Sequence, residues 1–330
     1  MPSDEDDHWA RIHLLFPCLL DASSFFLPKL RLQLQDKECR EVAVALIHKY
    51  FPPSTTPIES EKEPLRAPVG TPFFGLERFV TVYAAALPVQ AHLCSRALLC
   101  CYLPLCLDLL KRKQQLTRED SSLPSKNNTM KRLMVGISGA AGSGKSVFSA
   151  VLCECLNCVL PVGEGCCVVG LDGYHRYNDS LRTRDSKHLK GRPCTFDIEK
   201  LERDVEQLAK SAGKVRLPAY DRTIHDPVED AIVVDEPPRC CIVLVEGILL
   251  LTQPFIDVSR HLHCSIFLDL DVDVAKERVN RRKMDGGVSH AETEAHYLRV
   301  DLPNHQDMKA ACNADFTLVQ DGTSFGYVLS

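Results

Sequence analysis

Residues 132–146 read RLMVGISGAAGSGKS, and this stretch decides the fold. Its first part, Leu133 to Ile137, is a short apolar run with β-branched side chains, which predicts one buried strand. After Ser138, the eight residues from Gly139 to Ser146 match G-x-x-x-x-G-K-[ST] at every fixed position. Strand, glycine loop and helix, in this order, are the context that a phosphate-binding loop requires. The apolar residues that follow recur at the spacing of such a helix: Val147, Val151, Leu152 and Cys155.

The motif predicts a ligand as well as a fold. Backbone N–H groups of a glycine-rich loop turn inward around phosphate oxygens, and the following helix N-terminus adds positive potential. Lys145 is expected to reach the β- and γ-phosphates of ATP, and Ser146 to hold Mg²⁺ through its hydroxyl. The sequence thus predicts an ATP site formed by Gly139, Ala140, Ala141, Gly142, Ser143, Gly144, Lys145, Ser146 and Val147.

Composition narrows the classes of partner. The chain has 330 residues, 45% of them apolar and 25% charged, which is typical of a soluble globular protein. The net charge is −5 without a basic tail or stripe, which disfavours nucleic acid as a partner. The oligomeric state stays open, and a homo-oligomer is compatible with the sequence.

Cysteine usage indicates the compartment. Several of the 16 cysteines are adjacent pairs within apolar runs, such as Cys100-Cys101 and Cys166-Cys167. Neighbours on a strand point to opposite faces, so these pairs are expected to be buried thiols rather than metal ligands. Free thiols imply a reducing compartment, and the acidic start MPSDEDDH resembles neither a signal nor a transit peptide. We therefore expect a cytoplasmic protein.

The first 128 residues are expected to form a helical N-terminal extension without a chemical motif. Proline-rich residues 52–72 and polar residues 114–130 have the composition of linkers. The apolar stretch Phe79 to Leu110 contains prolines and charges, so we expect buried helices there and no membrane span. The basic triplet Lys111 to Lys113 suits the end of such a helix.

The remainder, residues 129–330, is predicted to be an α/β domain of the P-loop NTPase type, with a parallel sheet flanked by helices. Asp197 and Gly213 are expected to begin and end a helix, and Ser289 with Glu292 to form a capping box. Ligands of such folds bind at the carboxyl ends of the strands. The further strands are expected at Cys166–Leu171, Cys240–Val245, Cys264–Leu268 and Phe316–Val319.

Two carboxylates follow predicted strands, Asp172 and Glu246. With the Ser146 hydroxyl they are suitable oxygen ligands for Mg²⁺. Asp172 is also a candidate for the catalytic base, because phosphoryl transfer to an alcohol needs a carboxylate to accept the hydroxyl proton. The alternative for each carboxylate alone is a helix N-cap.

Seven segments together resemble the phosphoribulokinase and uridine kinase family of P-loop kinases, over residues 131 to about 319. In chain order they are GISGAAGSGKS, LDGYH, KGRPCTFD, LPAYDRTIHDPV, VLVEGILLL, an arginine-rich segment with Gly286-Gly287, and DLPN. The resemblance implies that Asp172 is the catalytic base and that Ser146, Glu246 and Asp172 arrange Mg²⁺. It also implies that the basic helix Val274 to Met284 belongs to a mobile lid, in which Arg278, Arg281 or Arg282 neutralises charge on the transferring phosphoryl group. The alternative for this helix is a solvated basic face.

The acceptor is less well defined. Tyr220 and His225 have the spacing that uridine kinases use for nucleoside recognition, although packing and a loop histidine are the alternatives. Uridine kinases usually have D-S-F-Y where this chain has Asp172-Gly-Tyr-His175, so Tyr174 and His175 are further substrate candidates. The Asp172-Gly-Tyr-His175 sequence of this chain is more similar to a nucleoside kinase-like branch of the family and to pantothenate kinase. A nucleoside is the first acceptor candidate; pantothenate, a sugar and glycerate are the alternatives.

Two other functions compete with a kinase. One is a nucleotide-binding regulator that has lost transfer and holds a partner through residues 1–128. The presence together of Lys145, Ser146, Asp172 and Glu246 disfavours it. The other is a GTPase-like switch, which the absence of an N-K-x-D motif disfavours.

Overall fold

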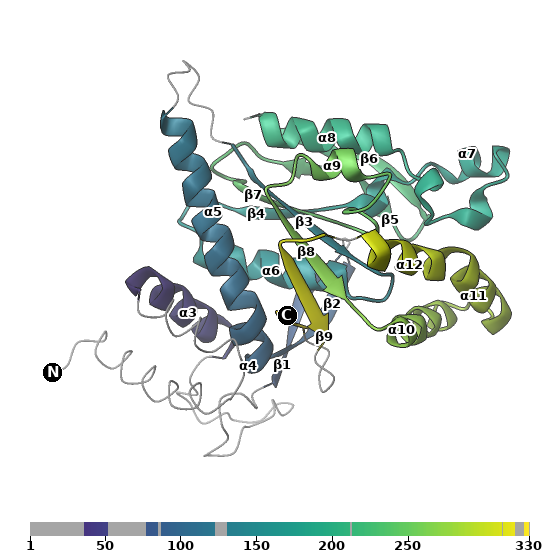
Figure 1. Ribbon diagram of the computed structural model, residues 1–330, viewed down its shortest axis with the longest axis horizontal. Coiled ribbons are helices and arrows are strands. Elements are labelled where there is room, and N and C mark those ends of the chain that lie inside the picture. Colours follow the sequence, from purple (N-terminus) through teal and green to yellow (C-terminus); the bar gives the residue numbers. More distant parts are fainter. Residues whose placement is uncertain are drawn as a thin grey trace.

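The computed structural model describes residues 36–51, 77–84, 87–122, 131–211, 213–311, 313–320 and 327–329. A six-stranded sheet with the order β10-β9-β8-β3-β7-β4 lies at its centre (Figure 1). Five strands are parallel, and β10 (Tyr327–Leu329) runs antiparallel to β9 (Phe316–Gln320). The other four are β3 (Leu133–Gly139), β4 (Cys166–Gly170), β7 (Ile242–Gly247) and β8 (Cys264–Asp269). The predicted α/β architecture is confirmed.

Alternation along the strands gives the sheet two buried faces. In β3, Val135 and Ile137 join one hydrophobic cluster, and Met134 joins another. The first cluster includes side chains of α6 (Lys145–Val159), and the second includes side chains of α8 (Ile198–Lys210) and α9 (Ile256–Ser259). Figure 1 shows α8 and α9 over one face and α6 over the other. A parallel strand buried on both sides needs this continuous apolar sequence.

Helix α8 begins as predicted and ends differently. Asp197 is its N-cap and accepts a hydrogen bond from Lys200 N at 3.1 Å. The helix ends at Lys210, before the predicted stop at Gly213. The fully buried Arg132 guanidinium donates to four main-chain carbonyls here. They belong to Leu208, Ser211, Gly213 and Asp235, at 3.1, 2.5, 2.6 and 2.9 Å. This arginine therefore satisfies helix-end carbonyls that a glycine motif would otherwise satisfy.

The described part of the N-terminal region is largely helical, with α3 (Lys37–Tyr50), α4 (Ser95–Ala97) and α5 (Leu103–Ser122). The expectation of helices throughout Phe79 to Leu110 is wrong for its first half. Strands β1 (Glu77–Ala84) and β2 (Leu87–Cys94) form an antiparallel hairpin there. Its alternation is clear in burial, since Val82 is buried while Phe79 and Tyr83 are 63% and 74% exposed. Apolar residues on both faces conceal this alternation in the sequence.

The predicted helix end at Lys111 to Lys113 is also wrong. After a π-helical turn (Leu98–Tyr102), α5 continues to Ser122 and takes in part of the predicted linker 114–130. The cations make lateral contacts instead: Arg112 pairs with Asp108 at 2.5 Å, and Lys113 pairs with Glu164. The other predicted linker, 52–72, lies outside the described residues.

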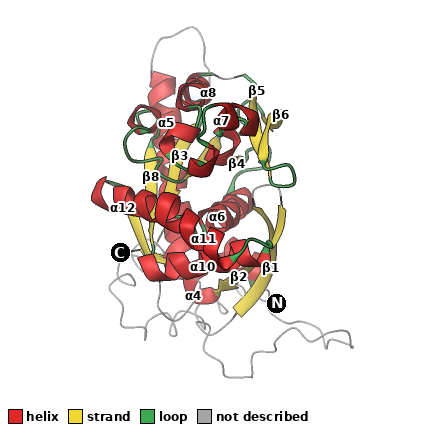
Figure 2. Ribbon diagram, turned by 90° about the vertical axis from the view of Figure 1, so that its right-hand side faces the viewer, coloured by secondary structure: helices red, strands yellow, loops and turns green. Residues whose placement is uncertain are grey.

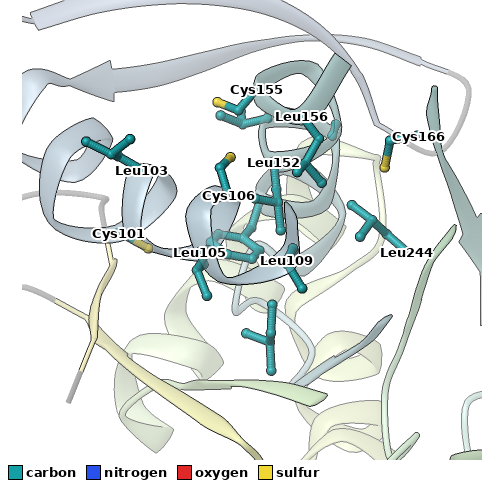
Figure 3. Close-up of a cluster of buried hydrophobic side chains, with 14 of the residues drawn as sticks. Cys101, Leu103, Leu105, Cys106, Leu109, Leu152, Cys155, Leu156, Cys166 and Leu244 are labelled. Carbon is teal, nitrogen blue, oxygen red and sulfur yellow. The ribbon is translucent and has the colours of Figure 1, made fainter. Parts of the chain in front are cut away.

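The N-terminal helices pack directly on the phosphate-binding half of the molecule. One hydrophobic cluster contains α3, the β1–β2 hairpin, α5, α6 and one face of the sheet. Figure 3 shows Leu105, Cys106 and Leu109 of α5 beside Leu152 and Cys155 of α6. The predicted extension thus covers the helix that follows the glycine loop.

One hairpin and three helices surround the carboxyl ends of the strands. The antiparallel hairpin of β5 (Val215–Asp221) and β6 (Asp226–Val234) lies on one side. Helix α10 (Val272–Asp285) packs against α11 (His290–His296) and α12 (Leu302–Ala311), as Figure 2 shows. The π-helical turn Tyr297–Asp301 joins α11 and α12 end to end. The predicted capping box of Ser289 and Glu292 opens α11. Among the described residues, no helix is both long and apolar enough to cross a membrane.

Candidate active site

The glycine loop connects the central strand β3 to α6. Gly142 and Gly144 have φ angles of +84° and +80°, a backbone region that side chains other than glycine rarely adopt. Gly144 is the N-cap of α6 and offers no side chain to its first amides. Those N–H groups and the helix dipole suit an anionic ligand such as a phosphate. Of the predicted ATP-binding residues, Gly139 ends β3, and those from Ala140 to Val147 lie in this loop and the first turn of α6.

Ser146 and Glu246 meet beside this loop. The Ser146 hydroxyl donates to Glu246 Oε1 at 2.9 Å. They come together because β3 and β7 are neighbours, with Ile137 opposite Glu246. Glu246 is only 5% exposed, and its Oε2 has no hydrogen-bond partner in the described part of the chain. Burial raises the pKa of Glu246, and the Lys145 charge opposes that rise.

This arrangement fits Mg²⁺. A buried carboxylate oxygen without a donor is costly, and a cation would satisfy it. A hydroxyl and one or two carboxylates, completed by water and phosphate oxygens, form the usual protein environment of this ion. Asp172 is the third predicted ligand. It follows β4 in the helical turn Leu171–Tyr174, next to β7, so its charge also acts on Glu246.

Asp172 has a partner that the sequence reasoning missed. Arg222, in the turn of the β5–β6 hairpin, donates from Nη2 to Asp172 Oδ2 at 3.4 Å. Arg222 is 50 residues away from Asp172 in the chain, and it reaches the carboxylate only because the hairpin folds back. A signal was available in the turn itself, where Asp221 Oδ1 accepts from Thr223 N at 2.7 Å. Such a turn within YDRTIHD indicates a hairpin, which would have directed attention to Arg222.

Two of the four predicted substrate residues lie beside Asp172. The His175 ring stacks on Phe196, with centroids 4.0 Å apart, and meets the Tyr220 ring edge-on at 5.7 Å. Burial lowers the pKa of His175 to about 4, so its imidazole is neutral at physiological pH. Burial and the Asp172 charge raise the pKa of Tyr220 to about 12. Lys190 lies over the Tyr220 ring, 5.1 Å from its centroid.

The other two predicted substrate residues are placed differently. Tyr174 is 1% exposed and belongs to the hydrophobic cluster beneath α8. Burial raises its pKa, with the Asp204 carboxylate as a further cause. The His225 side chain is exposed in the hairpin turn, where its φ is +54°. Its carbonyl accepts from Lys190 Nζ at 2.7 Å, so its main chain organises the loop.

The basic helix α10 lies against the glycine loop through one of its three predicted arginines. Arg278 donates from Nη1 to the Gly142 carbonyl at 3.4 Å. Arg281 pairs with Glu277 at 2.7 Å on the helix surface, and both Arg281 and Arg282 are exposed. The structure therefore brings Arg278 to the predicted phosphate site and leaves the other two in solvent.

Two of the quoted segments bind each other. Asn304 of DLPN, fully buried on α12, donates to the Gly191 carbonyl of KGRPCTFD at 2.9 Å. Arg192 Nη1 in turn donates to Asn304 Oδ1 at 2.6 Å, and Arg192 pairs with Asp307 at 3.2 Å. These contacts connect the helices beside the glycine loop to the acceptor side of the site.

Comparison with known proteins agrees with this geometry. The profile of the Phosphoribulokinase / Uridine kinase family matches residues 134–308. The uncharacterized protein YggC of Escherichia coli (strain K12) is 34% identical over 179 residues, which cover 54% of this chain and 73% of that protein. A uridine kinase of Clostridium perfringens is 33% identical over 183 residues, 53% of this chain and 81% of that enzyme.

A solved structure extends the similarity to three dimensions. It is a putative fructose transport system kinase from Silicibacter sp. TM1040, with a TM-score of 0.55 and 31% identity. The match covers 65% of this chain and 97% of that one. The glycine loop, the Ser146–Glu246 pair and these relatives lead to one assignment: the chain belongs to the Phosphoribulokinase / Uridine kinase family and is a small-molecule kinase.

Proposed function

We propose that this protein transfers the γ-phosphoryl group of ATP to a hydroxyl of a small metabolite. The observation that carries the proposal is the Ser146–Glu246 hydrogen bond beside Asp172, at the edge of a phosphate-binding loop. Phosphoryl transfer needs little covalent chemistry from the protein and depends on positioning and charge stabilisation. A loop, a hydroxyl–carboxylate pair and a second carboxylate supply both.

The site residues then divide the tasks among them, and Asp172 has two. The loop amides and Lys145 hold the ATP phosphates, and Ser146, Glu246 and Asp172 would hold Mg²⁺, which neutralises phosphate charge. Asp172 accepts the proton of the acceptor hydroxyl. The hydroxyl oxygen bonds to the γ-phosphorus while the bond to the bridging oxygen breaks, and ADP leaves. Arg278, in contact with the loop, adds positive charge near the transferring group.

A nucleoside is the first acceptor class to test, because relatives are named uridine kinase and Tyr220 lies beside Asp172. A smaller polar acceptor, such as a sugar, glycerate or pantothenate, is the second. The placement of the rings favours the second class: Tyr174 is buried, His175 is stacked, and Lys190 covers Tyr220. Base stacking would need a free aromatic face.

The test is a transfer screen of the purified full chain with ATP, Mg²⁺ and a panel of nucleosides, sugars and hydroxy acids. Product is measured by mass spectrometry, and ATP consumption is measured alongside. We expect ATP consumption that depends on one acceptor class and yields its phosphate ester. Tight nucleotide binding without transfer to any acceptor would contradict the proposal and favour the nucleotide-binding regulator.

A further inference from the structure

A short strap, residues 190–196 (KGRPCTF), crosses from α12 to the acceptor side of the site. At one end it binds Asn304, a fully buried side chain of α12. The Asn304 amide donates to the Gly191 carbonyl at 2.9 Å and accepts from Arg192 Nη1 at 2.6 Å. Arg192 also pairs with Asp307, three residues further along α12, at 3.2 Å. Both hydrogen-bonding functions of a buried amide are therefore spent on this one contact.

The other end of the strap contacts the acceptor side. Lys190 Nζ donates at 2.7 Å to the His225 carbonyl, in the turn of the β5–β6 hairpin, and lies over the Tyr220 ring. The Phe196 ring stacks on His175, with centroids 4.0 Å apart. The strap thus holds both the hairpin and the segment that follows β4.

Hydrogen bonds across the strap connect its two ends. The hydroxyl of the fully buried Thr195 donates to the Arg192 carbonyl at 2.7 Å and accepts from Gly191 N at 3.0 Å. The Thr195 carbonyl accepts from Arg176 N at 2.8 Å, so the strap is also fixed to the main chain beside His175. Because these bonds join residues at both ends, we expect the strap to move as one unit.

Helix α12 is connected in turn to the glycine loop through α10. The two helices pack together, and Lys283 of α10 pairs at 3.0 Å with Asp301, in the turn that precedes α12. Arg278 of α10 donates to the Gly142 carbonyl of the loop at 3.4 Å. A nucleotide that fixes the loop should therefore also restrict α10 and α12.

We propose that Asn304 and Arg192 are positioning residues through which ATP in the glycine loop orders the β5–β6 hairpin on the acceptor side. A site that the first ligand has already ordered costs the second ligand less conformational entropy. The effect is reciprocal, so each ligand should increase the affinity for the other. This inference rests on the proposed binding of ATP and acceptor, and it adds a dependence of one on the other.

Hydrogen exchange tests the proposal on the full chain without knowledge of the acceptor. The probe is adenylyl imidodiphosphate, a non-hydrolysable ATP analogue, added with Mg²⁺. Mass spectrometry follows backbone amides in residues 139–159, the loop and α6, and in residues 215–234, the hairpin. We expect the analogue to slow exchange in both regions, by at least about fivefold in the hairpin, the lower end of typical coupling between sites.

Variants then locate the coupling. Arg192→Gln removes the contacts to Asn304 and Asp307, and Asn304→Asp keeps its shape but cannot donate to the Gly191 carbonyl. Both should keep the protection of the glycine loop, while the slowing in the hairpin falls below about twofold. Arg192→Lys, which keeps a cation opposite Asp307, should recover part of it. Gln306→Ala, exposed on α12 between the two contacts, is the matched control and should behave as wild type.

Melting curves of the variants separate a loss of coupling from a loss of folding. A hairpin whose exchange ignores the analogue in wild type, while the glycine loop is protected, would overturn the inference and leave the ATP site intact. Equal hairpin protection in wild type and in both variants would overturn it too. Absence of protection at the loop itself would contradict the proposed ATP site and the inference with it. Coupled protection in a protein that phosphorylates no acceptor would contradict the proposed transfer and still support the strap.

Discussion

At the scale of single residues, the site combines two carboxylates in different surroundings. Asp172 is partly exposed and contacts Arg222, whereas Glu246 is buried with one oxygen unpartnered. A buried charge without full compensation lowers stability and is retained where function needs it. Glu246 is therefore expected to reduce the stability of the ligand-free protein and to increase the affinity for Mg²⁺ and ATP.

Replacing Glu246 tests this trade-off. Burial raises the folded-state pKa of Glu246 above its ordinary value of 4.5. Above pH 4.5 the unfolded chain loses this proton while the folded chain keeps it, so the free energy of unfolding falls as pH rises. Glu246→Gln removes that fall. Without Mg²⁺, its melting temperature should match wild type near pH 4 and exceed it at pH 7, by about 2–4 °C for each kcal/mol recovered.

The same variant should lose affinity for Mg²⁺ and ATP. Glu202→Gln, on α8 away from the loop, is the control and should change neither property. A Glu246→Gln protein that melts below wild type at pH 7 would show that the carboxylate stabilises the fold rather than serving a ligand.

Much of the site at this scale follows from the sequence. The motif itself identifies Lys145 and Ser146, and Asp172 and Glu246 each follow a buried run, where parallel sheets place their ligands. Arg222 could not be found this way. It lies in a polar segment without periodicity, and it contacts Asp172 only because β5 and β6 fold into a hairpin.

At the scale of elements, the glycine loop and α10 support each other. A Cβ at Gly142 would come within 2.7 Å of the Ala275 carbonyl and 3.1 Å of Val279 Cγ2, both on α10. The loop can therefore keep its conformation only while this position lacks a side chain. The sequence motif requires glycine at its ends, Gly139 and Gly144, and so does not predict the constraint at Gly142.

Gly142→Ala should therefore be severe. It combines a φ of +84° with a clash against main chain, and we expect a loss of about 1–3 kcal/mol in unfolding free energy together with most ATP affinity. The matched control is Gly163→Ala, which has a φ of +89° and no neighbour within 4 Å. Chemical denaturation and calorimetric titration measure both losses. Equal effects of the two substitutions would show that α10 does not constrain the loop.

The sequence is least informative about the secondary structure of two N-terminal segments, the β1–β2 hairpin and the end of α5. The strands β1 and β2 have alternating burial, but apolar residues on their exposed face give the same appearance as a buried helix. Helix α5 continues beyond Lys113, where Arg112 pairs with Asp108 and Lys113 pairs with Glu164. Glu164 lies 51 residues away in the chain, so local sequence could not reveal that partner.

At the scale of the whole molecule, the N-terminal region and the kinase region share one hydrophobic core. Leu105 and Leu109 of α5 are fully buried in the cluster that contains Leu152 of α6. The sequence places every chemical motif after residue 128, which favours an independent kinase unit. On the sequence alone, a chain beginning near Asn127 is expected to bind ATP. The shared core leads us to expect that this truncated chain aggregates, because it would expose one face of α6.

A point substitution examines the shared core without truncation. Leu109→Ala should lower the free energy of unfolding by about 2–5 kcal/mol, as buried leucines do. The whole chain should still melt in one transition that ATP shifts upward. Gln115→Ala, exposed on the same helix, is the control and should melt as wild type does. A separate early transition that leaves the ATP-dependent one unchanged would mean that the extension folds by itself.

Transfer of a phosphoryl group at Asp172 is tested by a paired measurement on one variant. Asp172→Asn keeps the shape of the side chain, but an amide cannot accept the proton of the acceptor hydroxyl. We expect product formation, followed by mass spectrometry with the acceptor found in the screen, to fall by about 10²- to 10⁴-fold. ATP affinity, measured by calorimetry, should stay within about tenfold, or about 1.4 kcal/mol, because Lys145 and the loop amides still hold the phosphates. Lys145→Ala is the contrasting control and should lose nucleotide binding while keeping a native melting curve. Undiminished product formation by Asp172→Asn would remove Asp172 from the mechanism and contradict the placement of the acceptor beside it.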